Sequence, residues 1–347
     1  MHIFTSFSHC AYHSAKEKNE FHLFLALYGQ HELLFRRHSV TFNTGYLHQT
    51  TYWVTSKSQI MFHGNISLIL CIYMRIIYIT LKLTIEANML THSEISNFNK
   101  YGFLIKRMYL AESCLDEMQH VAVHHLENHI SPIEFEADLK YPGAPDSSNA
   151  PGGKTSRRLL QAYARDLSFQ RWAKNHTLGE NLRQLFATKN DLFLSQCHHN
   201  CVMTKAKTYS SATLWHQDNR YWSFEEENLI SVWLALGDEN KKNGCLYVIP
   251  GSHHLEIHPE RFNEALFLKN NDVQNELLIK NAEAAELQKG DVLFFHSKLF
   301  HAAGRNNTSR TKLSVVFTFH EFGNNPINGT RSAEQPSIQI SRASKSD

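Results

Sequence analysis

The sequence is short of net charge and of paired cysteines, and both shortages narrow the class of protein. It has 35 Lys and Arg against 33 Asp and Glu, a formal charge of +2, which argues against nucleic acid or an anionic membrane as a partner. Its six cysteines are scattered without the spacing of a disulfide framework, which favours a reducing compartment and a cytoplasmic protein. Histidine is abundant instead, and 23 imidazoles raise the prospect of metal chemistry.

Proline and aspartate are absent from residues 1–88, which therefore differ in composition from the rest of the chain. This segment ends in an apolar run, residues 66–85, whose 20 residues are long enough to span a bilayer. Arg75 would lie near the centre of such a span, at a cost of about 2.5–3.5 kcal/mol. The run also lies too far from the N-terminus to be a signal peptide.

Three interpretations of this N-terminal segment stay open: a membrane anchor at 66–85, a genuine extension, and a mis-assigned start codon. We favour the mis-assigned start and expect no membrane association. The reason is that Met89 is followed by a sequence that opens as a domain should. Thr91 and Glu94 have the spacing of a capping box before a short helix.

The hydrophobic pattern from Met89 onward predicts one domain, residues 89–325, with helices before strands. Apolar residues at three- and four-residue spacing predict helices within 111–129 and 157–187. Arg157 and Arg158 are expected on a solvated face of the second helical region, with contact to an anionic group of the substrate as the alternative. Between the two regions, the Pro- and Gly-rich residues 141–156 predict a long loop that forms a lid.

Short apolar runs bounded by turn residues fill the second half of the domain. They predict strands within residues 103–105, 192–203, 229–236, 245–249, 283–287, 291–296 and 312–320. The predicted fold is therefore mainly β with flanking helices, as a sandwich or barrel. The last residues, 326–347, are rich in Ser, Asn and Gln and are predicted to be a disordered tail.

The segment Thr213–Trp222, TLWHQDNRYW, carries the first two candidate metal ligands. His216 and Asp218 are separated by one residue, so they face the same side of an extended chain. An imidazole and a carboxylate placed together are two ligands of the facial triad that binds non-haem Fe(II). Taken alone the motif is weak, because histidine is so common in this chain.

A second segment, residues 290–320, offers a third ligand and a cation. It contains His296 and His301, and then Arg310 and Lys312 two positions apart. Iron takes a third imidazole in such a triad, and a dicarboxylate cosubstrate needs a cation for its far carboxylate. The two segments together thus contain the residue types that such an oxygenase needs.

Four segments in order carry a family resemblance: NKYGFLIKR at 99–107, WHQDNRYW at 215–222, VWLALGDENKKNGCLYVIPGSH at 232–253, and GDVLFFHSKLFHAAGRN at 290–306. Together they resemble the phytanoyl-CoA dioxygenase family of Fe(II)- and 2-oxoglutarate-dependent oxygenases, over roughly residues 89–322. The combination is far more specific than any one of the motifs.

The resemblance implies a double-stranded β-helix (jelly-roll) core in which His216, Asp218 and His301 bind iron and His296 is structural. It implies an enzyme that uses Fe(II), 2-oxoglutarate and O2, with ascorbate as an optional activator. Such an enzyme hydroxylates an aliphatic C–H bond of a small-molecule or acyl substrate and releases succinate and CO2. It is expected as a monomer or homodimer. Two other functions stay open, a non-catalytic metal-binding jelly roll and an oxygenase tethered to a membrane by residues 66–85.

For the cosubstrate, the resemblance implies a cation eleven residues after His301, where this chain has Lys312 and the family prefers Arg. Arg310, two residues earlier, has the preferred bidentate chemistry, so both residues are candidates and Lys312 is favoured. Ala303 stands where the family often has Ser, which would remove one hydrogen bond to the cosubstrate.

Four further positions near 2-oxoglutarate are implied by the resemblance. They are Trp222 as an aromatic wall, Trp233 in the pocket lining, and Asn200 and Lys205, with Lys207 as the alternative to Lys205, before the first motif. Just before them, CHHNC at 197–201 has metal-like spacing. No second ligand pair follows it, so a closed zinc site is not expected.

Overall fold

The computed structural model describes residues 39–44, 47–53 and 89–341. The chain divides into two compact units, Met1–Asn88 and Met89–Asp347. In the first unit, β1 (Ser39–Thr44) and β2 (Leu47–Trp53) pair as antiparallel strands. The apolar run 66–85 lies outside the described residues, and the mis-assigned start stays a prediction. Within the described ranges, no helix has the length and apolar character that a membrane crossing requires.

The second unit is built on two antiparallel sheets. The smaller sheet has the strand order β11 (Glu283–Ala285), β10 (Leu246–Val248), β13 (His301–Ala303), β8 (Thr213–His216). The larger sheet has the order β3 (Phe103–Lys106), β12 (Val292–His296), β9 (Ile230–Ala235), β14 (Lys312–Glu321), β7 (Asn200–Lys205), β5 (Ser156–Leu160), β4 (Ile133–Phe135). At one end of β14, β6 (Leu192–Leu194) pairs with it and with β15 (Ile338–Ile340). Neighbouring strands are mostly distant in sequence, as expected for a jelly roll.

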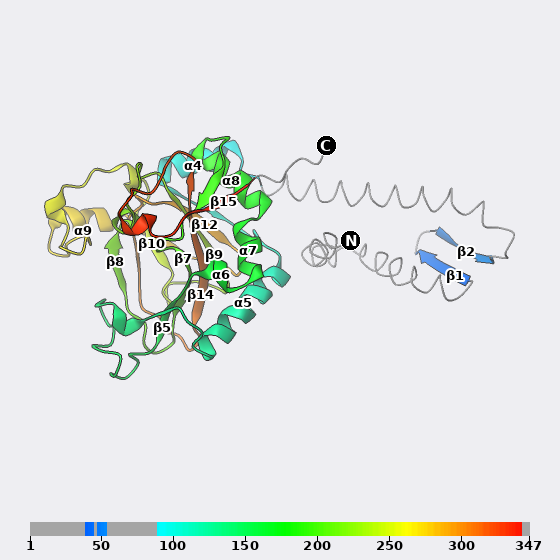
Figure 1. The fold of residues 1–347 in the computed structure, drawn as a ribbon, viewed down its shortest axis with the longest axis horizontal. Helices are drawn as coiled ribbons and strands as arrows, with labels where there is room; N and C mark the ends of the chain where they lie inside the picture. Colours follow the sequence, from blue (N-terminus) through cyan, green and yellow to red (C-terminus); the bar gives the residue numbers. More distant parts are fainter. Residues whose placement is uncertain (1–38, 45–46, 54–88, 342–347) are drawn as a thin grey trace. The chain divides into compact units, whose positions relative to one another are not determined.

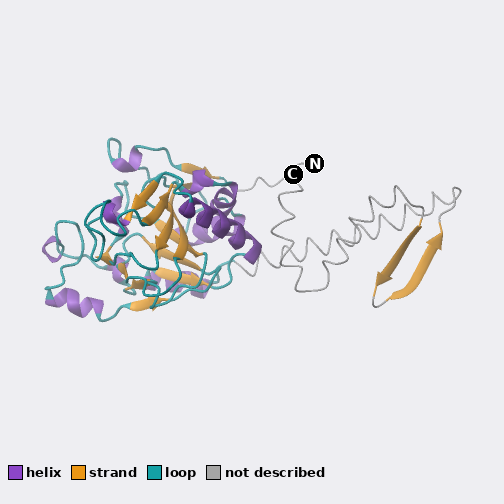
Figure 2. Cartoon of the chain, turned by 90° about the horizontal axis from the view of Figure 1, so that it is seen from below, coloured by secondary structure: helices purple, strands orange, loops and turns teal. Residues whose placement is uncertain are grey.

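Helices cover one side of the larger sheet, and the smaller sheet lies on the other side (Figure 1). The covering helices are α4 (His92–Tyr101), α5 (Glu112–Glu127), α6 (Ala162–Arg165), α7 (Leu167–Ala173) and α8 (His176–Phe186). The short helix α9 (Val273–Ile279) lies apart from them, on the side of the smaller sheet. Figure 2 shows the same division, with several purple helices packed beside the orange strands. The mainly β prediction with flanking helices is therefore confirmed. The predicted capping box at Thr91 and Glu94 also starts α4.

The central strand β14 is buried on both faces, because it has a layer on each side. Val315 and Phe317 belong to the core formed with the helices, whereas Val316 belongs to a second core between the sheets. This period of two places Lys312 and Ser314 on the same face as Val316, toward the smaller sheet. The same alternation on β7 and β9 decides which side chains reach the interior between the sheets.

Two sequence predictions about local structure are wrong. Residues 157–160, predicted as part of a helix, belong to the strand β5, which pairs with β4 and β7. The predicted disordered tail is ordered as far as residue 341, because β15 pairs with β6 and buries Ile340. Two isoleucines at alternate positions supply the apolar face that this strand needs. Residues 342–347 lie outside the described part of the chain.

Candidate active site

Adjacent strands of the smaller sheet bring the three predicted metal ligands together. His216 is the last residue of β8, and His301 is the first residue of β13. The two histidines are direct partners in the antiparallel register of these strands. Asp218 begins the short 3-10 helix that follows β8, Asp218–Tyr221, so its carboxylate turns back toward both imidazoles. All three side chains are buried.

The hydrogen bonds of the two imidazoles prepare them for a metal ion. Nδ1 of His216 lies 2.8 Å from the carbonyl oxygen of Leu214, and Nδ1 of His301 lies 3.0 Å from that of Leu299. Each Nδ1 must therefore carry the proton that it donates, which leaves a lone pair on Nε2. Both Nε2 atoms lie 3.5 Å from Oδ1 of Asp218.

The donor set of this cluster fits a divalent metal ion. Neither carboxylate oxygen of Asp218 has a hydrogen-bond partner in the described part of the chain, although the group is fully buried. Burial acts to raise the pKa of Asp218, but the imidazoles of His199 and His301 outweigh it and lower the pKa below its usual range. Burial lowers the pKa of His301 to about 4, so its ring is neutral at physiological pH. A buried anion facing two lone pairs is the arrangement that a bound cation stabilises.

A small cavity of about 50 Å³ extends from the cluster of His216, Asp218 and His301, hereafter the metal cluster, into the space between the sheets. His216 and His301 line one part of it, and three of the predicted cosubstrate residues line the rest: Trp233, Lys205 and Lys312. Ala303 also lines the cavity, at the position where the family often has Ser.

Lys312 does not meet this cavity as a free cation. Its Nζ lies 2.8 Å from Oε2 of Glu239, and both side chains are buried. The other oxygen of Glu239 accepts hydrogen bonds from Trp233 Nε1 at 2.9 Å and Ser314 Oγ at 2.6 Å. The role of Glu239 was not predicted from the sequence. The only signal was a carboxylate in the GDEN turn after β9, and nothing local indicated that this turn reaches β14.

Lys205 differs from Lys312 in its partners. Its Nζ donates to the carbonyl oxygen of Ser211 at 2.8 Å, and it forms no ion pair with a carboxylate of the described chain. Burial, followed by the charges of Arg157 and Lys312, lowers its pKa well below the usual value for lysine. A buried ammonium with spare donors beside a cavity is a natural contact for an anion.

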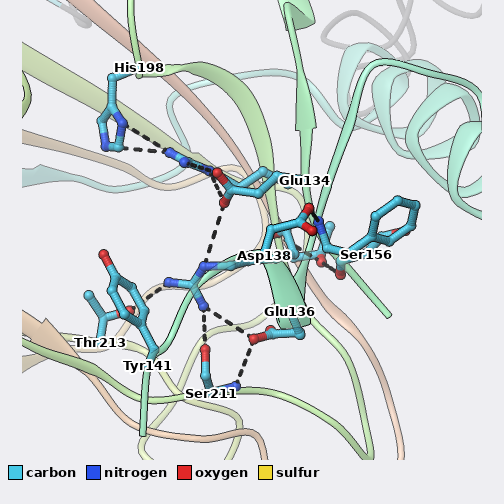
Figure 3. A network of polar contacts seen from close by, with 12 residues as sticks. Glu134, Glu136, Asp138, Tyr141, Ser156, His198, Ser211 and Thr213 are labelled. Carbon is cyan, nitrogen blue, oxygen red and sulfur yellow. Dashed lines mark hydrogen bonds and ion pairs between the residues drawn. The ribbon is translucent and has the colours of Figure 1, made fainter. Parts of the chain in front are cut away.

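Arg157 and Arg158 also line the cavity, so the expectation of a solvated helix face is wrong. They lie on β5, where Arg158 forms a two-point ion pair with Glu134. Arg157 lies 3.5 Å from Glu136 and donates to Ser211 at 2.6 Å. Figure 3 shows this network, with dashed lines that also reach His198 and Thr213. Both guanidinium charges are thus balanced by buried or half-buried carboxylates.

Three predicted cosubstrate residues lie elsewhere. Arg310 is exposed in the turn before β14 and does not line the cavity. Trp222 donates from Nε1 to the carbonyl oxygen of Cys197 at 3.1 Å and packs into a separate apolar cluster. Asn200 accepts a hydrogen bond from the backbone of Tyr163 at 2.9 Å. Since Asn200 and Lys205 are an odd number of positions apart on β7, they face opposite sides of the sheet.

The structure also shows where His296 and the CHHNC segment lie relative to the candidate metal ligands. His296 lies beside His253, with 5.5 Å between ring centroids, and is not in the cluster of candidate metal ligands. In the CHHNC segment, Cys197 and Cys201 are buried free thiols outside that cluster. His199, however, lies beside Asp218, which the sequence did not indicate.

Comparisons with known proteins agree with this geometry. The model of the family described as phytanoyl-CoA dioxygenase (PhyH) matches residues 98–314. Human peroxisomal phytanoyl-CoA dioxygenase is 24% identical over 242 residues, covering 68% of this chain and 70% of that protein. The L-proline trans-4-hydroxylase of Streptomyces griseoviridis is 24% identical over 163 residues, covering 41% of this chain and 59% of that protein.

Among solved structures, EctD from S. alaskensis with 2-oxoglutarate and 5-hydroxyectoine superposes with a TM-score of 0.56 at 17% identity. The match covers 69% of this chain and 78% of that one. This likeness confirms the predicted double-stranded β-helix core. Because the family model spans more than half of the sequence, this chain belongs to the phytanoyl-CoA dioxygenase family of Fe(II)- and 2-oxoglutarate-dependent oxygenases.

Proposed function

We propose that this chain hydroxylates an aliphatic C–H bond of a small polar molecule, with Fe(II) at His216, Asp218 and His301. The observation that carries the proposal is the buried carboxylate of Asp218, which faces two imidazole lone pairs beside a cavity lined by cations. Iron bound there would supply the oxygen chemistry, in which the substrate, 2-oxoglutarate and O2 become the hydroxylated product, succinate and CO2.

The protein's own contribution is to hold the metal on one face and the cosubstrate in the cavity. His216, Asp218 and His301 would hold the ion and would leave room beside it for 2-oxoglutarate and O2. The far carboxylate of 2-oxoglutarate would then lie near Lys205 and Lys312. Lys205 supplies the unbalanced positive charge, because Glu239 already neutralises Lys312.

The charge count supports this assignment. Four cationic side chains line the cavity, and three of them pair with carboxylates, which leaves Lys205. A divalent metal and Asp218 together add one further positive charge. The two charges of the 2-oxoglutarate dianion would therefore be balanced when it binds.

A second cavity, of about 180 Å³, supports a polar substrate, and it shares the side chains of Arg158 and His198 with the first. Nine of its twelve lining residues have charged, amide or imidazole side chains. Asn200 lines it with a buried Nδ2 that has no hydrogen-bond partner in the described chain, and Arg331 lies at its rim without an ion pair there. Such walls would leave a long acyl chain without apolar contacts.

This second cavity is the larger of the two, at about 180 Å³ against about 50 Å³. We therefore place this chain with relatives such as the L-proline hydroxylase in substrate class, and not with those that act on phytanoyl-CoA. A cytoplasmic location and a monomeric or homodimeric state stay predictions.

The test is succinate formation by purified protein with Fe(II), 2-oxoglutarate and ascorbate. L-Proline and ectoine are the polar probes, phytanoyl-CoA is the acyl probe, and Asp218→Ala is the inactive control. We expect a polar probe to stimulate succinate release above the rate without substrate. Stimulation by phytanoyl-CoA alone would overturn the substrate class. Binding of Fe(II) and 2-oxoglutarate with no succinate under any condition would favour the non-catalytic jelly roll.

A further inference from the structure

The two oxygens of the Asp218 carboxylate have different neighbours. Oδ1 lies 3.5 Å from Nε2 of both His216 and His301, where a metal ion would bind. Oδ2 lies 3.4 Å from Nδ1 of His199, in the bend just before β7. In the described chain His199 is thus the third imidazole within reach of this carboxylate, and it approaches the oxygen that the other two leave free.

His199 is held in this position by its surroundings. Its side chain is buried, and its Nδ1 also lies 3.3 Å from Oγ of Ser231 on β9. Ser231 in turn shares a hydrogen bond of 2.8 Å with Oγ1 of Thr318 on β14. The backbone of Thr318 donates to the carbonyl oxygen of His199 at 3.1 Å. The ring of Trp222 packs edge-on against it, with 5.4 Å between centroids.

We propose that His199 is a positioning residue for the metal ligand Asp218: it donates from Nδ1 to Oδ2, so that only Oδ1 is presented to the metal. The proposal rests on the proposed iron site and adds a residue to it. At 3.4 Å the contact is longer than a standard hydrogen bond. Contacts of this kind are often long without ligands and shorten in the working complex.

The physical benefit is a fixed, single-point carboxylate. Without a donor on Oδ2, Asp218 can rotate or bind the metal through both oxygens, which would occupy a position needed by 2-oxoglutarate or O2. Outer partners of metal ligands typically change metal affinity or activity by about 10–100-fold when they are removed. Ser231 and Thr318 let β9 and β14 of the larger sheet support a ligand that the smaller sheet provides.

Three substitutions of His199 test whether a hydrogen-bond donor is needed at the position of its Nδ1. In His199→Asn the amide nitrogen occupies nearly the place of Nδ1, in His199→Gln it lies farther out, and His199→Leu removes the donor. His320→Asn is the matched control, because His320 is a buried histidine hydrogen-bonded to Ser337, away from the cluster. Co(II) is the probe, with its dissociation constant and its visible d–d spectrum as readouts, and thermal unfolding of the metal-free protein reports folding.

We expect His199→Leu and His199→Gln to weaken Co(II) binding by about 10–100-fold. Their d–d spectrum should also change, because a carboxylate bound through both oxygens would displace a water ligand and alter the geometry around Co(II). His199→Asn should keep the affinity within a few-fold and keep the spectrum of the unmodified chain. The control should match the unmodified chain in both readouts. If His199→Leu does not fold, the difference in Co(II) affinity between His199→Asn and His199→Gln still tests the proposal.

Two results would overturn the inference. The first is unchanged affinity and spectrum in the Leu and Gln variants while His216→Ala loses the metal. The second is a loss of Co(II) affinity in His199→Asn equal to that in His199→Leu, with a spectrum that indicates fewer protein ligands. That result would make His199 a fourth ligand. Failure of the unmodified chain to bind Co(II) would instead count against the proposed metal site itself.

Discussion

Lys312 and Glu239 form an ion pair with 2.8 Å between Nζ and Oε2, and both side chains are almost completely buried. The pair is close to neutral as a unit. A carboxylate that approaches Lys312 therefore also meets the negative charge of Glu239. The cation expected to hold the cosubstrate is thus already balanced, and Lys205 is the neighbouring cation without a carboxylate partner in the described chain.

Removal of Lys205 should weaken cosubstrate binding most directly. A charge-assisted contact to a carboxylate contributes about 1.5–3 kcal/mol, which corresponds to roughly a ten- to hundredfold change in affinity. Lys205→Met should raise the KM for 2-oxoglutarate by about that factor and leave metal affinity nearly unchanged. Arg310→Ala is the control and should have little effect, because Arg310 is exposed and outside the cavity. Steady-state kinetics of succinate release measures both.

Variants of the Lys312–Glu239 pair should distinguish its role in cosubstrate binding from that of Lys205. Lys312→Met alone leaves a buried carboxylate unpaired, which costs about 3–5 kcal/mol of stability and repels 2-oxoglutarate. Lys312→Met combined with Glu239→Gln removes both charges. If Lys205 supplies the net charge, this double variant should recover most of the lost cosubstrate affinity. A double variant as weak as Lys312→Met would return the role to Lys312.

Loss of any one metal ligand should abolish iron binding. His216→Ala, Asp218→Ala and His301→Ala each leave two protein ligands, so the ion would be held mainly by water. His296→Ala should retain iron and lose mainly stability, because His296 packs against His253 and not in the metal cluster. Iron content after gel filtration gives the answer. Retention of iron by His301→Ala and its loss in His296→Ala would reverse the assignment.

Acid should destabilise the metal-free protein partly through His320. Burial lowers the pKa of His320 to about 4, whereas an unfolded histidine titrates near 6.5. The neutral form is favoured in the fold, so stability is complete above about pH 6.5 and is lost as the pH falls toward 4. Between pH 7.5 and 4.5, urea unfolding should show about 2–3 kcal/mol more loss for the unmodified chain than for His320→Asn. Equal losses of unfolding free energy in the two proteins would contradict the role of His320 in acid destabilisation.

The ordered C-terminal strand should contribute to stability. Ile340 is buried in the main core, and its carbonyl oxygen accepts from Arg183 at 3.3 Å. Ile340→Ala should lower the free energy of unfolding by about 2–5 kcal/mol. Gln339→Ala, on the exposed side of the same strand, removes only an exposed hydrogen bond to Asp191 and should lower it by less than about 1 kcal/mol. Equal, small effects would show that β15 is not part of the folding unit.

Much of the fold, and the proximity of the three candidate metal ligands, could be predicted from the sequence, because their signals are local or carried by motifs. The capping box at Thr91 and the apolar runs of β9, β12 and β14 depend on neighbours within a few residues. His216 and Asp218 lie two positions apart, and the family resemblance selects His301. Alternation on β7 could also have excluded Asn200 once Lys205 was chosen, since the two residues face opposite sides.

The features that were missed depend on contacts between distant segments. Glu239 meets Lys312 only because the turn after β9 lies beside the start of β14. His199 meets Asp218 only because β7 and the turn after β8 enclose the same space. Arg157 is buried because Glu136 and Ser211 meet its charge. In each case the sequence alone predicts a solvent-exposed polar residue, because its buried partner lies far away along the chain.

The pairing of His216 with His301 also fixes when this protein can acquire its metal. The two residues are 85 positions apart in sequence and become neighbours only when β8 and β13 align in one register. A slip of one residue would turn one imidazole to the opposite face. Long-range pairing of this kind forms slowly, since the loop between the strands must close first. Iron bound at the proposed site would therefore enter a nearly finished barrel, and it would not serve as a template for the early steps of folding.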